Sequence, residues 1–208
     1  MRFRKKVLCS LLAATMCCTP VLNGCSSPEK SSSAESEDRT EEETTSSSHA
    51  AGDSEEGNLG EFSMKDINDV TYTQEMFADY DLTLINVFAT WCSPCVREIP
   101  DLNKLYEEMQ EQGVNVAGIV LDAADGSGNT DYDAVEKAKV LAEKTGVSYP
   151  FLIPDEGYLN GRLAGIAAVP ETFFVDKDGN IVGETISGSR SFESWKSIVE
   201  KELEEVAK

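Results

Sequence analysis

Two cysteines stand two residues apart where the sequence changes from an apolar run to an amphipathic one. Cys92 and Cys95 lie in the segment 90–95, directly after the strand-like apolar run 84–89, and apolar residues then recur at helical spacing over 99–109. A cysteine at a helix N-terminus lies near unpaired backbone N–H groups and the positive end of the helix dipole. Both favour the thiolate, which is the nucleophilic form. The spacing therefore predicts two-electron thiol–disulfide exchange.

The residues of this segment take different roles in the interpretation. Cys92 is the more exposed of the pair at a helix N-terminus and is the expected attacking thiol. Cys95, one turn into the helix, is the expected resolving thiol, which attacks the mixed disulfide and frees the product. Trp91 shields the site and offers substrate a flat apolar contact. Pro94 lacks an N–H group, so it limits the donors near Cys92 and stiffens the turn.

Other uses of a Cys-x-x-Cys pair fit this sequence less well. A structural zinc site needs about four ligands, yet no second pair follows the leader and the one histidine is His49. Haem attachment requires a histidine directly after the second cysteine, where Val96 stands. A structural disulfide in an oxidising compartment stays open, although a strand-to-helix corner behind a tryptophan is an unusual place for one.

The N-terminal part of the sequence predicts an export signal followed by a tether. Basic residues precede the short apolar stretch 7–16, which has the form of an export signal and not of a transmembrane helix. It ends in Leu-Asn-Gly-Cys, similar to a lipobox, so Cys25 is the expected lipidation site; ordinary cleavage to a soluble secreted protein is the alternative. We expect a lipoprotein signal peptide at 1–24 and, over 25–61, a disordered acidic tether rich in Ser and Glu.

Composition limits the partners. The chain has 38 Asp and Glu against 18 Lys and Arg, a formal net charge of −20. Phosphate neutralisation needs basic patches, so the balance argues against nucleic acid as a partner. It also argues against electrostatic adhesion to anionic lipid, which leaves the lipid anchor to hold the protein on the membrane.

The remaining residues, 62–208, predict one α/β domain. A parallel strand–helix–strand unit is followed by an antiparallel hairpin and a last helix. The expected elements are a hairpin over 62–67 and 70–73, a strand over 84–89, a helix to 112 containing Pro100, a strand over 114–121, a helix capped by Asp131 or Asp133, a short strand over 149–153, a helical turn over 158–164, strands after Pro170 and over 181–184, and a helix from Ser191.

The segment 87–100, from Val-Phe-Ala-Thr-Trp through both cysteines to Ile-Pro, resembles the active-site segment of the thioredoxin superfamily. More narrowly it is similar to the membrane-tethered TlpA/ResA-type thiol–disulfide oxidoreductases of bacteria. The resemblance implies a thioredoxin-like fold, with a central mixed β-sheet flanked by helices, an N-terminal hairpin and an inserted helix. From the residues alone Pro170 only begins a strand, but the resemblance matches it to a cis-proline. That proline would turn the backbone of Val169 toward Cys92 to pair with a substrate strand.

Three further positions depend on the resemblance. Thioredoxins carry a buried Asp where Asn86 stands here, and Asn cannot titrate. ResA-like proteins have a Glu near the cysteines at the position of Glu98, which leads to the hypothesis that Glu98 assists proton transfer at Cys95. The alternative is a surface glutamate paired with a basic residue. Glu171 replaces the usual Thr after the cis-proline, and a carboxylate close to the thiols would disfavour the Cys92 thiolate and repel acidic substrates.

The resemblance implies an enzyme on the outer, extracytoplasmic face of a bacterial membrane, with no bound cofactor and no metal. Reduction of client disulfides is the favoured direction because Cys-x-Pro-Cys resembles thioredoxin's own sequence. A CcdA/DsbD-type membrane electron donor would supply electrons. Clients of this kind of enzyme include apocytochrome c, methionine sulfoxide reductase and misoxidised secreted proteins. The alternatives are a disulfide-donating oxidase, a thiol peroxidase, whose Pro-x-x-x-Thr-x-x-Cys pattern is absent here, and a non-catalytic surface binding module on a thioredoxin scaffold.

Overall fold

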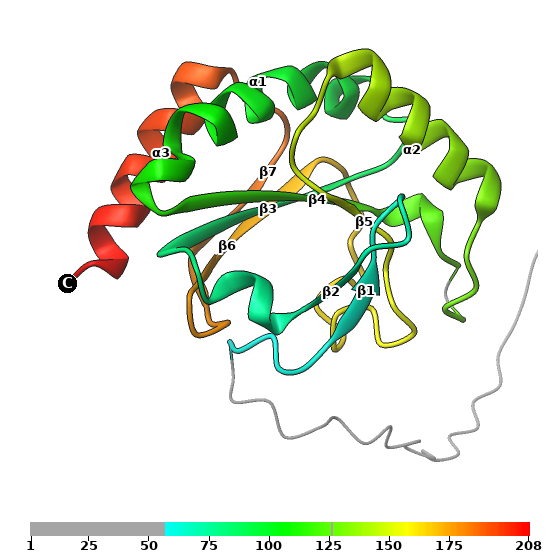
Figure 1. The fold of residues 1–208 in the computed structure, drawn as a ribbon, viewed down its shortest axis with the longest axis horizontal. Helices are drawn as coiled ribbons and strands as arrows, with labels where there is room; N and C mark the ends of the chain where they lie inside the picture. The colour runs from blue at the N-terminus through cyan, green and yellow to red at the C-terminus, as the bar shows by residue number, and fades with distance from the viewer. Residues whose placement is uncertain (1–56, 126) are drawn as a thin grey trace, which may run out of the picture. The chain divides into compact units, whose positions relative to one another are not determined.

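The computed structural model describes residues 57–125 and 127–208. They form a mixed five-stranded sheet with the strand order β5-β4-β3-β6-β7 (Figure 1). The strands are β3 (Leu82–Phe88), β4 (Val114–Val120), β5 (Phe151–Leu152), β6 (Glu171–Asp176) and β7 (Ile181–Ser187). The central strand β3 pairs parallel with β4 and antiparallel with β6. The predicted α/β fold with a thioredoxin-like mixed sheet is confirmed.

Helices cover one face of the sheet, and the N-terminal hairpin lies on the other (Figure 1). The helices are α1 (Ser93–Met109), α2 (Tyr132–Thr145) and α3 (Phe192–Val206), and the hairpin is β1 (Ser63–Lys65) and β2 (Thr71–Thr73). Short 3₁₀ helices are η1 (Gln74–Phe77), η2 (Gln110–Gln112) and η3 (Leu121–Ala123). Every residue of β3 and β4 is buried, because both faces of these strands are covered.

Side-chain caps explain where the helices begin. Cys92 is the N-cap of α1, and Pro94 stands in its first turn, where a missing N–H is tolerated. The carboxylate of Asp131 accepts hydrogen bonds from two backbone N–H groups at the start of α2, so Asp131 is the cap of the two candidates. Ser191 caps α3 as predicted. Each helix therefore starts at a side chain that accepts a hydrogen bond from one or two of its free N–H groups.

The end of β1 and the residues that follow it are also hydrogen-bonded to the edge strand β5. The N–H of Ile67 donates to the carbonyl of Phe151 over 2.9 Å, and the N–H of Ile153 donates to the carbonyl of Lys65 over 2.8 Å. These bonds cover the free edge of β5, which would otherwise be open to pairing with another chain. The hairpin predicted from the alternating pattern is thus present, and the segment that follows β1 covers the edge of β5.

The folded part begins before residue 62, where the predicted tether ends. Leu59 is buried and its N–H donates to the carbonyl of Gly179, while Asn58 forms a β-bridge with Asn180. Leu59 is the apolar residue that makes this contact with the turn between β6 and β7. One apolar residue within a polar stretch is too short a pattern to predict the contact from the sequence. The predicted signal peptide, the lipidation site Cys25 and the tether up to residue 56 lie outside the described residues.

The turn over 158–164 differs from the predicted helical turn. Tyr158, Leu159 and Asn160 have positive φ angles of 50°, 52° and 52°, so the chain turns left-handed here. This conformation is unfavourable for L-residues. Side-chain contacts hold it: Asp155 accepts from the N–H of Leu159, and the Asn160 amide donates to the carbonyl of Leu59 over 2.7 Å. Contacts to distant residues therefore override the local preference.

Candidate active site

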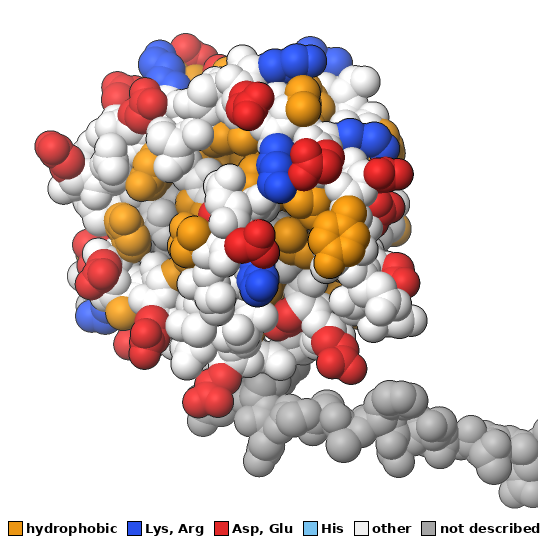
Figure 2. All heavy atoms as spheres, turned by 45° about the vertical axis from the view of Figure 1, so that its right-hand side comes forward, with side chains coloured by type: hydrophobic (Ala, Val, Ile, Leu, Met, Phe, Trp, Pro, Cys, Tyr) orange, Lys and Arg blue, Asp and Glu red, His pale blue; other side chains and the backbone are white. Residues whose placement is uncertain are grey.

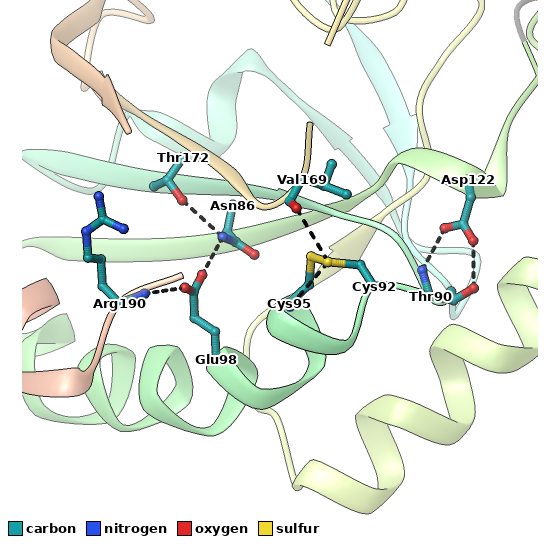
Figure 3. Close-up of a disulfide and its surroundings, with 9 residues drawn as sticks. All are labelled: Asn86, Thr90, Cys92, Cys95, Glu98, Asp122, Val169, Thr172 and Arg190. Carbon is teal, nitrogen blue, oxygen red and sulfur yellow. Dashed lines mark hydrogen bonds between the residues drawn. A yellow bond between two sulfur atoms is a disulfide. The ribbon is translucent and has the colours of Figure 1, made fainter. Parts of the chain in front are cut away.

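Cys92 and Cys95 form a disulfide at the N-terminus of α1, beside the end of β3 (Figure 3). Their Cα atoms are 5.3 Å apart. The Cys95 N–H donates to the sulfur of Cys92 over 3.3 Å, so one of the free N–H groups of the helix points at this sulfur. Cys92 retains a small exposed fraction of 4%, whereas Cys95 has none. This difference favours Cys92 as the sulfur that a substrate reaches first.

The peptide bond between Val169 and Pro170 is cis, as the resemblance implied. The carbonyl oxygen of Val169 lies 3.6 Å from the sulfur of Cys92 (Figure 3). The register of β3 with β6 accounts for this closeness, because Val87 pairs with Glu171 and so brings the cis peptide to the end of β3. The disulfide and the start of β6 therefore share one site, although 77 residues separate Cys92 and Val169.

Glu98 is buried on the inner side of α1, with 2% of its surface exposed. Its Oε1 accepts a hydrogen bond of 2.9 Å from the Asn86 amide, and its Oε2 accepts one of 2.7 Å from the backbone N–H of Arg190 (Figure 3). The Asn86 amide also donates to the hydroxyl of Thr172 over 3.0 Å. The alternative of a surface glutamate paired with a basic side chain is wrong.

Burial raises the pKa of Glu98 to about 7, because the interior disfavours the charged form. Hydrogen bonds from Arg190 and Asn86 oppose this rise by stabilising the carboxylate. A carboxyl group with this pKa can take or release a proton near neutral pH. It stands three residues after Cys95, on the same side of the helix.

Asp122 holds the segment in front of the disulfide, a role that sequence reasoning missed. Its two carboxylate oxygens accept from the N–H of Thr90 over 2.9 Å and from the hydroxyl of Thr90 over 2.6 Å (Figure 3). Asp122 follows β4, the parallel neighbour of β3, so both residues lie at the same end of the sheet. Polar residues just beyond the carboxyl ends of adjacent parallel strands were the available signal. Thr172 and Arg190 were also missed.

The predicted contact residues beside the disulfide are accessible. Trp91 is 73% exposed and Pro94 is exposed, so both can meet a partner. Val169 is half-buried, and its carbonyl faces the disulfide. Their roles in binding substrate stay predictions.

The expectation that the Glu171 carboxylate lies close to the thiols is wrong. Phe174 packs in the apolar cluster that contains the cysteines, whereas Phe173 packs in the cluster on the other face of the sheet. Because side chains alternate along a strand, Glu171 shares the face of Phe173 and points away from α1. Its carboxylate pairs with Arg162 over 3.0 Å, with both side chains less than 20% exposed. A role of Glu171 in substrate contact stays a prediction.

Comparison with known proteins identifies the family. The profile of the AhpC/TSA family matches residues 58–183, more than half of the chain. The chain belongs to the AhpC/TSA family. It is similar to the thiol-disulfide oxidoreductase ResA of Bacillus thuringiensis (strain Al Hakam), at 33% identity over 117 residues, which cover 56% of this chain and 61% of ResA. It is also similar to the thiol:disulfide interchange protein DsbE of Haemophilus influenzae, at 37% identity over 112 residues, 53% of this chain and 54% of DsbE.

This AhpC/TSA-family chain thus spans about three fifths of the length of the curated relatives it matches. Among solved structures, a thioredoxin-family thiol:disulfide interchange protein from Chlorobium tepidum TLS aligns with a TM-score of 0.58 and 26% identity, covering 73% of this chain and 99% of that one. StoA from Bacillus subtilis aligns with a TM-score of 0.52 and 20% identity, covering 68% of this chain and 97% of StoA. This likeness supports the fold.

The described part of this AhpC/TSA-family chain was compared with the requirements of a metal site and of a membrane-spanning helix, and it meets neither. Within 57–125 and 127–208, no group of three or more His, Cys, Asp or Glu side chains is arranged to hold a metal ion. No helix in these two ranges has the length and apolar character needed to cross a membrane.

Proposed function

We propose that this chain is a thiol–disulfide oxidoreductase that reduces disulfides of client proteins through Cys92 and Cys95. The observation that carries the proposal is the position of the Val169 carbonyl, 3.6 Å from the sulfur of Cys92. An extended client segment that pairs with this carbonyl would bring its own sulfur to Cys92. The names of the relatives ResA and DsbE, a thiol-disulfide oxidoreductase and a thiol:disulfide interchange protein, support the same activity.

The proposed reaction starts from the reduced pair. The Cys92 thiolate attacks one sulfur of the client disulfide, whose S–S bond breaks as the mixed disulfide forms, and the released client thiolate takes up a proton. Cys95 then loses its proton to the ionised Glu98 and attacks the sulfur of Cys92. This step breaks the bond between Cys92 and the client sulfur and forms the Cys92–Cys95 disulfide. The second client sulfur leaves as a thiolate and takes up a proton, which completes the transfer of two electrons to the client.

The proposal also covers the electron donor, the clients and the location of the protein. The oxidised pair is returned to the dithiol by a membrane thiol carrier of the CcdA/DsbD type, and a lipid on Cys25 holds the domain on the outer face of the membrane. The export-type leader and the lipobox-like segment support this location. Clients are disulfide-bearing proteins outside the membrane, such as apocytochrome c or methionine sulfoxide reductase.

Reduction of insulin by the pre-reduced protein tests the activity. We expect Cys92→Ser to abolish the reaction and Cys95→Ser to accumulate a mixed disulfide with insulin. If the Cys92→Ser variant replaces the wild-type protein in cells without loss of function, the protein is a non-catalytic binding module. Faster oxidation of the dithiol by hydrogen peroxide than by insulin would indicate a thiol peroxidase.

The reduction potential of the Cys92–Cys95 pair tests the direction. A value near or below about −250 mV, in the range of thioredoxin, fits a reductase supplied through the membrane. A value above about −150 mV, toward that of DsbA, would make the protein a donor of disulfides. Equilibration with dithiothreitol or glutathione buffers gives the value directly.

A further inference from the structure

A hollow of about 660 Å³ lies at the end of the sheet where β3, β4 and β5 begin. Its walls come from the hairpin and η1 on one side, and from α1 and the segment before β5 on the other. Asn115, the second residue of β4, lines the hollow, whereas Asp122 follows the other end of β4 and holds the segment in front of the disulfide. At about 3.3 Å per residue, this strand separates the hollow from the disulfide site by roughly 20 Å.

Every charged residue that lines the hollow is acidic. The three are Asp66, Glu75 and Asp79, and none of them pairs with a lysine or an arginine within 57–125 and 127–208. Asp66 is 5% exposed, and its Oδ1 accepts from two backbone N–H groups of the hairpin turn. Burial, and after it the charge of Asp66, raises the pKa of Tyr72. The lining therefore favours a positively charged ligand.

The surface outside the hollow has the same sign of charge. The chain has a formal net charge of −20, and Figure 2 shows one face of the domain with acidic side chains all around its rim. A negative surface concentrates cations near the protein and repels anions. Charge alone selects no particular cation, so recognition depends on the other groups that line the hollow.

Aromatic side chains from four separate segments line the hollow, namely Tyr72, Tyr80, Tyr106 and Tyr149. The rings of Tyr106 and Tyr149 lie 6.3 Å apart at an angle of 70°. Asn103 on α1 fixes the segment before β5, because its Oδ1 accepts from the N–H and the hydroxyl of Ser148 over 2.8 Å and 2.9 Å. Tyrosine rings attract ammonium and guanidinium groups. This part of the lining thus suits an organic cation.

The buried amide of Asn115 has no partner in the protein. Asn115 is 6% exposed, and its side chain makes no hydrogen bond with any residue in the two described ranges. Val114 and Val116 pack in the cluster beneath α1, so the alternation along β4 turns Asn115 to the hairpin side, where it lines the hollow. Buried amides are normally satisfied. The Asn115 carbonyl oxygen can accept from an N–H group of a ligand.

We propose that this hollow binds an organic cation with N–H donors, which carries a guanidinium or a primary ammonium group. The carboxylates attract the cation, the tyrosine rings contact it, and the Asn115 carbonyl accepts one of its hydrogen bonds. No group of three or more His, Cys, Asp or Glu side chains in the described part of the chain is arranged to hold a metal ion, so these carboxylates fit an organic cation better. Binding here is separate from disulfide exchange at Cys92.

Calorimetric titration of the full-length oxidised protein with butylguanidinium and with N-butylurea tests the proposal. The two probes have nearly the same shape, but only butylguanidinium is charged. We expect butylguanidinium to bind about tenfold more tightly than butylurea, the gain of one charge-assisted hydrogen bond. Equal affinities for the two probes, or no binding of butylguanidinium, would overturn the proposal.

Two variants place the binding at the hollow. Asn115→Leu removes the amide at similar volume and should lower the affinity for butylguanidinium about tenfold. Its stability in urea should not fall, because the amide has no partner in the protein to lose. Asp79→Asn removes one exposed charge and should lower the affinity about threefold.

The matched control is Glu193→Gln, which removes an exposed charge in the first turn of α3 and should keep the wild-type affinity. An affinity that stays unchanged in both Asn115→Leu and Asp79→Asn would overturn the proposal. An equal loss in Asp79→Asn and Glu193→Gln would also overturn it, since the binding would then follow net charge and not the hollow.

A capped Gly-Arg-Gly peptide and its citrulline counterpart identify the source of the cation. Citrulline is the uncharged urea analogue of arginine. Binding of the arginine peptide as tightly as butylguanidinium would mean that the hollow takes a basic side chain of a partner polypeptide. Much weaker binding of this peptide than of butylguanidinium would mean that it takes a small diffusible cation. Tighter binding of the citrulline peptide than of the arginine peptide would contradict recognition of a charged group.

Discussion

Glu98 and Asn86 meet inside the fold, where the Asn86 amide donates to Glu98 over 2.9 Å and neither side chain is exposed to solvent. The amide also donates to Thr172, so it positions two acceptors without exchanging a proton itself. Thioredoxins carry an Asp at the place of Asn86. In this chain the titrating carboxyl stands on α1 instead of on β3, three residues from Cys95. The proposed proton acceptor, Glu98, and the proposed resolving thiol, Cys95, are therefore on the same helix.

The first prediction concerns the pH dependence of exchange. The pKa of Glu98 is about 7, so its carboxylate becomes available to accept the Cys95 proton as the pH rises through 7. The rate of resolution of the mixed disulfide should rise over the same range. In Glu98→Gln the inflection near pH 7 should disappear, and the rate at pH 8 should fall by about 10²-fold, a typical effect of losing a general base.

Single-turnover kinetics from pH 5 to pH 9 measure this effect. Glu111→Gln, which removes an exposed carboxyl in η2, should keep the wild-type profile. An unchanged inflection in Glu98→Gln would show that another group accepts the proton.

The second prediction follows from the same pKa and concerns stability. Between pH 4.5 and about 7 the folded protein keeps a proton on Glu98 that the unfolded chain has lost. The free energy of unfolding should therefore fall as the pH rises through this range. At about 1.4 kcal/mol per pKa unit, this group contributes a decrease of about 3 kcal/mol.

Urea titrations of the oxidised protein at pH 5 and pH 8 measure the decrease. The side chain introduced in the Glu98→Gln variant cannot ionise. The decrease in the free energy of unfolding from pH 5 to pH 8 should therefore be smaller in the variant by about 3 kcal/mol. An equal difference in the wild-type protein and the variant would contradict the assignment of the shift to Glu98.

Local spacing was enough to predict the reacting groups. Cys92 and Cys95 are three positions apart at a strand-to-helix boundary, and the cap and first turn of α1 follow from the same few residues. The cis bond before Pro170 was implied by the resemblance and not by the residues alone. The resemblance placed Glu98 near the cysteines, while its burial depends on the packing of α3 against α1, which the sequence does not show.

Contacts between distant segments could not be predicted from the sequence. Asp122 and Thr90 are 32 residues apart and meet because β3 and β4 are adjacent and parallel. The orientation of Glu171 depends on the register of β6, and its pairing with Arg162 depends on a left-handed turn that no local residue pattern favours. The sequence alone therefore suggested a carboxylate near the thiols, which the fold turns to the other face.

The third prediction concerns the bond between Asp122 and Thr90. Asp122→Ala removes both acceptors and leaves the N–H of Thr90 without its partner, so the free energy of unfolding should fall by about 2 kcal/mol. Thr90→Val removes the hydroxyl alone and should cost about 1 kcal/mol. The double variant should lose less than the sum, because the two changes share one interaction. Additive losses in urea titrations would contradict a direct coupling.

The last prediction concerns Arg162 and Glu171, which form a partly buried pair at 3.0 Å. A double-mutant cycle with Arg162→Met and Glu171→Gln should give a coupling free energy of about 1 kcal/mol, because solvent screens this pair only in part. The pair Lys196–Glu108 is more exposed and should give a value near zero in the same cycle. Glu171→Gln should leave the pH dependence of Cys92 alkylation in the reduced protein unchanged, since this carboxylate faces away from α1 and is neutralised by Arg162. An alkylation profile displaced to lower pH in Glu171→Gln would show that the charge of Glu171 reaches the thiol after all.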